Sequence, residues 1–430
     1  MFFLIATTGA ASSALVNRFE SLVCANCGRN YPTDTHSRCA KCNGILSAHY
    51  RLDGGFPTGG AQRGIWQFAE FLPPVREQNI VSLGEGWTPY VKAANYGRKI
   101  GLGNLWCKLE GCNPTGSFKD RAASLGLSLA REWRKRGVFT ASSGNAAAAV
   151  SAYSARAGIR CLVLIRDDSP ASKLSQITMY SPVLLRVRNL FESRSALEAA
   201  IEQTQLAVPD WLNHFIWAPF NPLLVDAFKT IAYEIALGRE VPDYLFVPVA
   251  GGDLLFGLYK GFQELREMGR LDSLPKLVAV QGEGADPLVR AIEKGLDTVP
   301  DTEPPHTVAG ALSVNFGAEY PIVAVRGTGG FGISVSDEEI LRGQREIARH
   351  EGIFCEVSSA TALAAISKAV KVGRIERDAS AAAILTGSGF KDYYPIVSEA
   401  SKIPLAESVS SIPRVLHAIL DARADAARIN

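Results

Sequence analysis

The sequence lacks an excess of charge of either sign. It contains 45 Lys+Arg and 43 Asp+Glu among 430 residues, a formal net charge of +2, and these charges do not gather into a long block of one sign. A basic arm or patch is the usual means by which a protein holds nucleic acid or an anionic membrane surface. We therefore expect neither nucleic acid nor a membrane as a partner.

The sequence also lacks a long apolar run. A helix needs about 20 consecutive apolar residues to cross a bilayer, and no stretch of the chain reaches that length. Residues 1–16 are largely apolar, but they have no basic residue and no continuous apolar core of the kind that marks a signal peptide. We expect residues 1–20 to be a soluble N-terminal segment, with a targeting peptide as the alternative, and the protein to be cytoplasmic.

Cysteines are few outside one cluster. Four of the eight are scattered through apolar or loop stretches, at positions 107, 112, 161 and 355. This distribution argues against a disulfide framework and suits reduced thiols in the cytoplasm.

The other four cysteines form two Cys-x-x-Cys pairs, Cys24 with Cys27 and Cys39 with Cys42, with eleven residues between the pairs. Two such knuckles can place four thiolates tetrahedrally around Zn²⁺. We predict a zinc-ribbon-like module over residues 21–52 with these four ligands. The alternative is a ribbon that has lost its metal.

The rest of the chain alternates between apolar runs and helical patterns, and it is too long for one hydrophobic core, which stops growing near about 250–300 residues. Strands are predicted over residues 137–141, 159–165, 244–249, 276–281 and 381–385, and a helix over residues 146–157. Repeated strand–helix units indicate parallel sheets covered on both faces, which bind ligands at the carboxyl ends of their strands. We predict an α/β protein with two doubly wound parallel-sheet domains.

One turn places a lysine at the start of a helix. In Asn113–Arg121 the turn contains Pro114 and Gly116, and Lys119 lies where the helix begins. The positive end of a helix dipole disfavours an ammonium there and keeps an amine nucleophilic. A solvated lysine in a turn is the alternative.

Three further stretches follow predicted strands. Ser142–Asn145 precedes a helix whose first N–H groups could hold a carboxylate, although a plain helix cap is the alternative. Val249–Leu255 is a short nest able to receive a phosphate. Leu385–Gly389 offers a neutral hydroxyl that could meet a heterocycle nitrogen, or it is only a polar strand end.

In this order and spacing, the four stretches resemble those of the fold type II pyridoxal 5′-phosphate (PLP) enzymes, which have the tryptophan synthase β-like fold. The particular residues resemble those of threonine synthases. The similarity extends from about residue 22 to residue 400 and includes Ser82–Pro89, Asn113–Arg121, Ser142–Asn145, Glu351–Glu356 and Thr386–Asp392. The four-cysteine ribbon is similar to one that precedes the catalytic domains of some members.

The resemblance implies a domain plan. A large PLP-binding domain would comprise residues 53–111 and 220–430, and a small α/β domain would comprise residues 112–219. The subunits would associate as a homodimer.

The resemblance also implies a role for each matching residue. Lys119 would hold PLP as a Schiff base and move protons, Asn145 would hydrogen-bond the 3′-oxygen, and Thr386 would face the pyridine nitrogen. The cofactor phosphate would be held by Ala250, Gly251, Gly252, Asp253 and Leu254. The amino-acid substrate would be bound by Ser142 and Ser143 at its carboxylate and by Thr88.

Two positions depart from the family pattern. Asp253 puts a carboxylate in the phosphate loop, where many relatives have small neutral residues, and we expect its side chain to cap the following helix. Ser313 stands where this segment usually continues into an arginine, a natural clamp for a substrate phosphate. The candidates for a substitute cation are Lys229, Arg121 and Arg194, and for each of them a surface or structural charge is the alternative.

These features predict a PLP-dependent lyase or synthase. The preferred activity is that of a threonine synthase, which converts O-phospho-L-homoserine and water to L-threonine and phosphate. The main alternative is β-replacement or β-elimination on O-phosphoserine or O-acetylserine, as in cysteate-synthase-like enzymes, which Ser313 keeps open. A non-catalytic amino-acid sensor is the third possibility, and the presence of both Lys119 and Asn145 argues against it.

Overall fold

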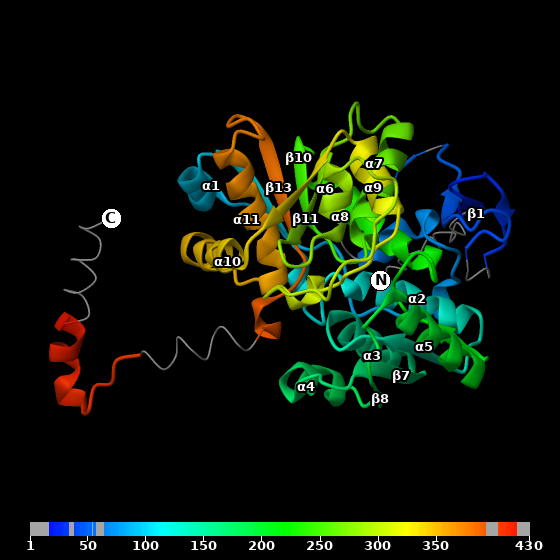
Figure 1. The fold of residues 1–430 in the computed structure, drawn as a ribbon, viewed down its shortest axis with the longest axis horizontal. Coiled ribbons are helices and arrows are strands. Elements are labelled where there is room, and N and C mark those ends of the chain that lie inside the picture. The colour runs from blue at the N-terminus through cyan, green and yellow to red at the C-terminus, as the bar shows by residue number, and fades with distance from the viewer. Residues whose placement is uncertain (1–16, 34–37, 54, 57–63, 393–402, 419–430) are drawn as a thin grey trace, which may run out of the picture. The chain divides into compact units, whose positions relative to one another are not determined.

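The computed structural model describes residues 17–33, 38–53, 55–56, 64–392 and 403–418 (Figure 1). Most of the predicted N-terminal segment, residues 1–16, lies outside the described residues. The chain divides into two units, residues 1–391 and residues 392–430. Among the described helices, none combines the length and the apolar character needed to cross a membrane.

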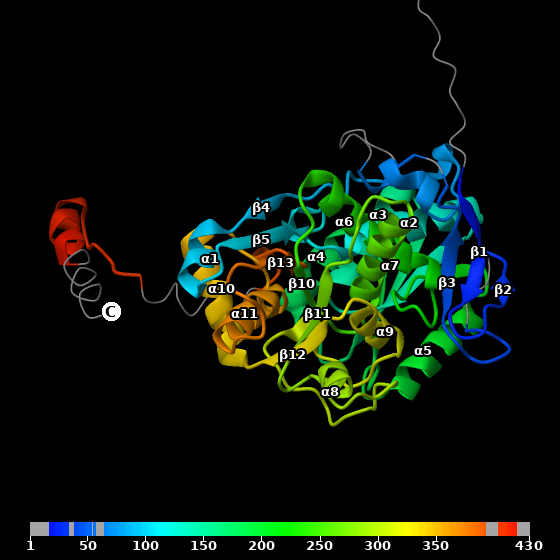
Figure 2. The same cartoon turned by 90° about the horizontal axis from the view of Figure 1, so that it is seen from above.

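The N-terminal module is a small antiparallel sheet. Its strands, in the spatial order β2-β1-β3, are β1 (Phe19–Cys24), β2 (Asn30–Tyr31) and β3 (Leu46–Tyr50). Figure 2 shows the module at one side of the first unit.

The larger parallel sheet has six strands in the order β12-β11-β10-β13-β5-β4. The strands are β4 (Tyr90–Lys92), β5 (Asn104–Leu109), β10 (Tyr244–Pro248), β11 (Lys276–Gly282), β12 (Phe331–Val335) and β13 (Ser380–Leu385). All neighbours are parallel except β4, which pairs with β5 in the antiparallel sense at the edge. Every residue of β10 is buried, as expected for a central strand of a sheet with helices on both faces.

Helices cover both faces of this sheet. They are α1 (Ala94–Ile100), α6 (Asp226–Gly238), α7 (Asp253–Glu267), α8 (Pro287–Glu293), α9 (Tyr320–Gly327), α10 (Asp337–Glu351) and α11 (Val357–Lys371). Figure 1 shows α1, α10 and α11 on one side of the strands and α6 to α9 on the other. Of these helices, α11 contacts β10 and β13, whereas α7, α8 and α9 contact β11.

The smaller sheet has four parallel strands in the order β8-β7-β6-β9. The strands are β6 (Gly137–Ala141), β7 (Arg160–Arg166), β8 (Val183–Val187) and β9 (Trp211–Asn213). The helices of this region are α2 (Lys119–Glu132), α3 (Asn145–Ala157), α4 (Ala171–Met179) and α5 (Arg194–Ala207). Both α2 and α3 contact the fully buried strand β6.

Short 3₁₀ helices connect these elements. They are η1 (Gly64–Phe71), η2 (Glu77–Asn79), η3 (Glu110–Cys112), η4 (Pro222–Val225), η5 (Gly310–Leu312) and η6 (Gly389–Lys391). The second unit contains η7 (Val409–Ser411).

The predicted fold class is confirmed. The chain is an α/β protein with two parallel sheets, and all five predicted strands exist with bounds that differ by at most one residue from those observed. The domain bounds inferred from the family resemblance stay a prediction. The structure adds that residues 392–430, which that plan assigned to the large domain, group apart from residues 1–391.

Candidate active site and metal centre

Lys119 is the first residue of α2, as predicted, and the turn before it is joined to the end of β13. The Phe118 N–H donates to the Thr386 carbonyl at 3.0 Å, and the Ser388 N–H donates to the Gly116 carbonyl at 2.9 Å. Two of the four stretches singled out in the sequence therefore lie side by side and hold each other by backbone hydrogen bonds.

The environment of Lys119 favours its neutral amine. Burial lowers the pKa of Lys119 from its usual value, while the carboxylates of Asp253 and Glu356 oppose that shift. Its Nζ atom also lies 4.6 Å from the centre of the Phe118 ring and 5.6 Å from that of Phe228. An amine with a lowered pKa is suited to act both as a nucleophile and as a base.

Glu356 connects the second and fourth stretches. Its Oε2 accepts from Asn145 Nδ2 at 2.9 Å, and its Oε1 accepts from Thr386 Oγ1 at 2.8 Å. The Thr386 hydroxyl is also 2.9 Å from that of Ser359. The side chains assigned to the cofactor's 3′-oxygen and pyridine nitrogen therefore converge on one buried carboxylate.

Sequence reasoning assigned Glu356 no role. The only sequence signal was its place in the Glu351–Glu356 segment, and nothing local to that segment indicates partners as distant in the chain as Asn145.

The predicted phosphate loop lies between β10 and α7. Gly252 has a φ of +96°, and a Cβ built there would come within 2.0 Å of Pro321 Cγ, so this position requires glycine. The loop leads directly into the first turn of α7, where free N–H groups and the helix dipole favour an anion. A glycine-rich turn ahead of a helix, with the amine of Lys119 on another element, fits the phosphate and aldehyde ends of PLP.

The Asp253 side chain has two partners outside its own helix, and its expected role as a cap of α7 stays a prediction. Its Oδ1 accepts from the Ala218 N–H and lies 2.8 Å from the Tyr320 hydroxyl, both on other segments of the chain. Burial raises the pKa of Asp253, and the Lys119 charge, these two donors and the N–H of Asp253 itself oppose the rise. The carboxylate is thus held by groups outside the loop as well as by its own N–H.

Ser142 and Ser143 lie at the start of α3, where they were expected. Ser142 Oγ accepts from the Gly144 N–H at 3.1 Å, and Ser143 Oγ accepts from the Arg166 N–H at 3.2 Å and from Ser169 Oγ at 2.6 Å. Gly144 is exposed and the two serines are partly exposed. This helix start is therefore open to a ligand.

Thr88 faces the protein core, which corrects its assignment to the substrate. It is 7% exposed, its hydroxyl donates to Glu110 Oε1 at 2.6 Å, and its carbonyl accepts from Lys108 Nζ. The hydroxyl hydrogen is used within a buried ionic cluster and does not point to a substrate.

Lys229 is also unsuited to bind a substrate phosphate, which corrects the sequence prediction. It is fully buried, lies 3.0 Å from Glu264 and 3.3 Å from Asp226, and stacks 3.6 Å above the centre of the Tyr50 ring. Two carboxylates already use its charge. With Tyr50 on β3, this contact is part of the anchor between the N-terminal module and α6.

The two alternative cations are paired as well. Arg121 is fully buried between Glu110 and Glu234. Arg194 pairs with Glu198 at 3.0 Å. The Arg194 pair is local to α5 and is visible in the sequence, whereas the partners of Arg121 come from distant parts of the chain and are not.

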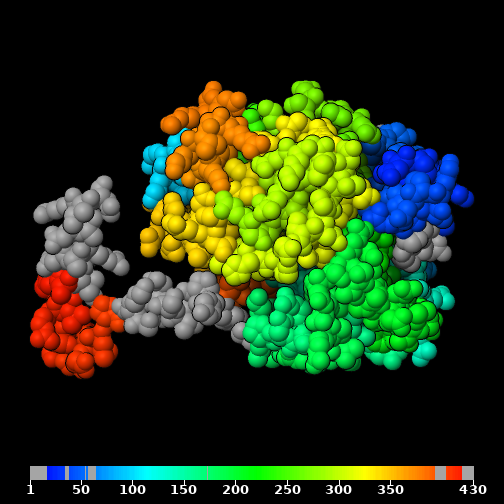
Figure 3. All heavy atoms as spheres, viewed as in Figure 1, coloured from blue at the N-terminus to red at the C-terminus, as the bar shows by residue number. Residues whose placement is uncertain are grey.

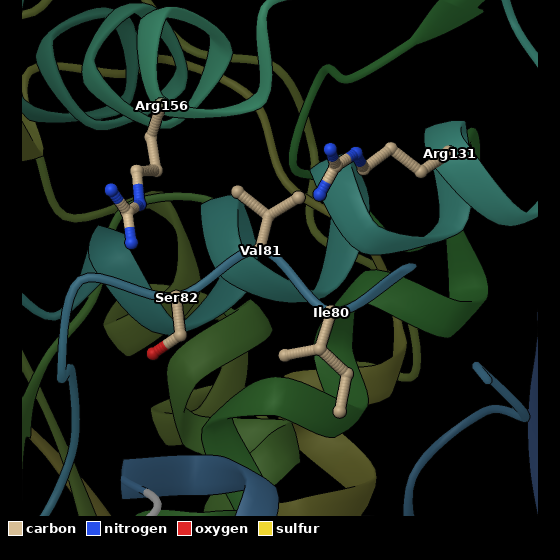
Figure 4. Close-up of a pocket in the computed structure, with 5 residues that line it drawn as sticks. All are labelled: Ile80, Val81, Ser82, Arg131 and Arg156. Carbon is tan, nitrogen blue, oxygen red and sulfur yellow. The ribbon is translucent and has the colours of Figure 1, made fainter. Parts of the chain in front are cut away.

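A surface pocket with two arginines lies at the far end of the same helices. Arg131 and Arg156 point toward residues 80–82 (Figure 4). They belong to the last turns of α2 and α3, where basic side chains offset the negative end of the helix dipole. Twelve residues of α2 separate Arg131 from Lys119, about 18 Å along the axis, so this pocket is apart from the candidate active site.

The four cysteines of the N-terminal module form a compact group. The Cys24 and Cys42 sulfurs are 3.5 Å apart, those of Cys27 and Cys39 are 3.6 Å apart, and all four sulfurs lie within 4.8 Å of one another. A tetrahedral ion with Zn–S bonds of about 2.3 Å requires sulfurs separated by about 3.8 Å. The four-cysteine group can therefore hold a zinc ion.

A family model described as pyridoxal-phosphate dependent enzyme matches residues 81–387. This chain belongs to that family. As a PLP-dependent enzyme it is also similar in sequence to threonine synthases. It is 34% identical over 380 residues to the threonine synthase of Methanocaldococcus jannaschii, covering 86% of this chain and 92% of the relative. It is 36% identical over 392 residues to that of Methanosarcina acetivorans, covering 87% and 93%.

Solved structures of PLP enzymes share the fold. Maize serine racemase superimposes with a TM-score of 0.63 and 22% identity, covering 73% of this chain and 92% of that chain. Threonine deaminase isoform 2 from Solanum lycopersicum superimposes with a TM-score of 0.63 and 20% identity, covering 82% of this chain and 91% of that chain. At such identities the likeness concerns the fold alone, and it agrees with the predicted fold type II architecture.

Proposed function

We propose that this PLP-dependent enzyme is a threonine synthase, which converts O-phospho-L-homoserine and water to L-threonine and phosphate. The observation that carries the proposal is the similarity to threonine synthases over 86–87% of the chain, at 34–36% identity. The homodimer and the cytoplasmic location expected from the sequence stay predictions.

Four groups would hold the cofactor. Lys119 would bind it covalently, Asn145 would meet its 3′-oxygen, Thr386 would meet its pyridine nitrogen, and residues 250–254 would receive its phosphate. PLP, when bound, withdraws electrons from the α-carbon of an attached amino acid. Lys119, with its lowered pKa, is the group that would move protons at the substrate carbons.

Thr386 supports elimination chemistry. Its hydroxyl has one hydrogen, which Glu356 accepts here and which would turn to the pyridine nitrogen when PLP binds. The partner that Thr386 offers to the ring is neutral and carries no charge. A neutral partner does not stabilise a protonated ring, and this favours loss of a leaving group over long storage of negative charge on the cofactor.

The start of α3 is suited to the substrate carboxylate. Ser142 and Ser143 stand ahead of its first turn, and the helix dipole there attracts an anion. Ser143 in turn contacts Ser169, just before α4.

Lys173 is the cation that we propose for a substrate phosphate. Lys173, on α4, is exposed, and within the described part of the chain it has no ion-pair partner. A Cβ built at Gly310 would lie 3.3 Å from Lys173 Nζ. Gly310 belongs to η5, directly before Ser313, the position at which the family arginine is missing. We assign to Lys173 the charge that Ser313 cannot supply.

The test is phosphate release measured side by side on O-phospho-L-homoserine and O-phospho-L-serine, with threonine identified by mass. We expect threonine from the first donor. Lys173→Met should raise KM for phosphohomoserine about tenfold or more, with a smaller loss of kcat, because binding energy at a remote phosphate is partly used in the transition state.

The matched control is Lys294→Met, which removes an exposed lysine at the end of α8 and should leave KM unchanged. Turnover of the serine donor alone would reject the proposal in favour of β-replacement or β-elimination. Equal KM values for the Lys173 and Lys294 variants would remove Lys173 from the substrate site.

We also propose that the four-cysteine group holds one structural zinc ion. Four thiolates complete its coordination and leave no position for a substrate. Metal analysis of protein made under reducing, zinc-replete conditions should give about one zinc per chain, and Cys24→Ser with Cys42→Ser should abolish it. The isolated thiol at Cys161 provides the control, since Cys161→Ser should keep the metal. Zinc-free wild-type protein would contradict the proposal.

A further inference from the structure

The first turn of α9 is packed against the predicted phosphate loop. The buried Tyr320 hydroxyl lies 2.9 Å from the Gly251 carbonyl oxygen and 2.8 Å from Asp253 Oδ1. Pro321 fills the space where a side chain at Gly252 would stand. Three consecutive loop residues therefore take their positions from two residues of another helix.

The same turn is bound by the N-terminal module. Glu319, immediately before α9, accepts from Arg38 Nη1 at 3.1 Å. Arg38 adjoins the metal ligand candidate Cys39, and its Nη1 also donates to the Asn43 carbonyl at 3.0 Å. The backbone of this knuckle is closed by a hydrogen bond from the Cys39 N–H to the Gly44 carbonyl at 2.8 Å. Arg38 thus joins the four-cysteine knuckle to the residue next to Tyr320.

The Tyr320 hydroxyl reduces the negative charge that the loop presents to a phosphate. The Gly251 carbonyl oxygen and the Asp253 carboxylate would both repel a phosphate bound beside them, unless hydrogen-bond donors offset their charge. Burial and the neighbouring Asp253 charge raise the pKa of Tyr320 well above its usual value, so the group remains a neutral hydroxyl that can donate. The hydroxyl has one hydrogen, which these two oxygens share. Its loss would leave the Gly251 carbonyl without this donor and Asp253 with the Ala218 N–H as its remaining donor outside α7.

We propose that Tyr320 is a positioning residue for the cofactor-phosphate loop, and that the four-cysteine module fixes it through the Arg38–Glu319 ion pair. The enzyme's affinity for PLP then depends on a contact from the N-terminal module. This inference rests on the assignment of residues 250–254 to the cofactor phosphate, and it does not depend on which amino acid the enzyme converts.

The chain offers a matched control. Arg18 also ties the N-terminal module to the rest of the unit by an ion pair, from its Nε to Glu70 at 3.0 Å, and its side chain is 14% exposed, against 18% for Arg38. Glu70, however, lies on η1, which contains no residue of the phosphate loop. Arg18→Gln therefore removes a comparable anchor without touching the path to Tyr320.

The experiment is titration of apo-enzyme with PLP, followed by the absorbance of the protein-bound cofactor. Tyr320→Phe should raise the Kd for PLP about tenfold, which corresponds to about 1.4 kcal/mol, and Arg38→Gln about three- to fivefold. Arg18→Gln should lower thermal stability and leave the Kd within about twofold of wild type. Combining Arg38→Gln with Tyr320→Phe should weaken binding no further than Tyr320→Phe alone, since both changes act through one hydroxyl.

An unchanged Kd in Tyr320→Phe would overturn the proposal, and so would equal effects of Arg38→Gln and Arg18→Gln. If Tyr320→Phe does not fold, the comparison of the two arginine variants decides by itself. The readout is cofactor binding, so a failure of threonine formation in the wild type would refute the proposed reaction and leave this result standing.

Discussion

Replacing Lys119 with alanine is expected to abolish both covalent PLP and turnover. The amine is the first residue of α2, its pKa is lowered by burial, and it is the one lysine assigned to the cofactor. The substitution removes nucleophile and base together, so kcat should fall by about 10³-fold or more. Borohydride reduction followed by mass analysis of peptides measures the covalent adduct, and product formation measures kcat.

Lys294→Ala, on the exposed end of α8, is the control and should retain both the adduct and full activity. Covalent PLP that persists on the reduced Lys119→Ala protein would show that another lysine carries the cofactor. The lowered pKa of Lys119 would then be a consequence of its burial without a role in catalysis.

The local features of this site were predictable from the sequence. The bounds of β6, β10 and β13 follow from short buried apolar runs, and the start of α2 at Lys119 follows from the turn residues before it. Such signals depend on neighbours in the chain. Polar stretches that follow parallel strands meet at one edge of the sheets, so their convergence could also be inferred.

The partners of charged side chains were not predictable. Glu356 meets Asn145 across 211 positions, and Lys229 meets Glu264 across 35. A lysine that is exposed and a lysine that is buried in an ion pair look the same in the sequence, because the pairing depends on which helices the fold brings together. This is why Lys229 was assigned to the substrate, whereas Lys173, beside η5, was not considered.

A second large effect is expected from Arg121→Met, measured as the free energy of unfolding in urea. Arg121 lies 2.7 Å from Glu110 and 2.5 Å from Glu234, and Lys108 is 2.6 Å from Glu234. The side chains of all four are at most 1% exposed. Without the guanidinium, one ammonium must balance two buried carboxylates, and breaking such a pair costs about 3–5 kcal/mol.

The cluster also predicts how wild-type stability depends on pH. Burial alone would raise the pKa of Glu234, but the charges of Arg121 and Lys108 outweigh it and lower that pKa to about 2. A carboxyl whose folded pKa is depressed stabilises the protein above its unfolded pKa of about 4.3, and that contribution is lost as pH falls toward 2. The free energy of unfolding of the wild type should therefore decrease between about pH 4.3 and pH 2. The decrease should be smaller in Arg121→Met, whose carboxylates have lost their main partner.

Arg342→Met provides the control, because Arg342 pairs with Glu338 at 2.9 Å on the exposed face of α10. Exposed pairs of this kind contribute about 0.3–0.5 kcal/mol. Equal losses in the two variants would mean that the buried cluster adds nothing beyond a surface pair, and that the core around α2 and α6 is held by its apolar contacts alone. A loss several-fold larger in Arg121→Met would show that the buried pairs of Arg121 with Glu110 and Glu234 hold η3, α2 and α6 together far more strongly than an exposed pair on one helix could.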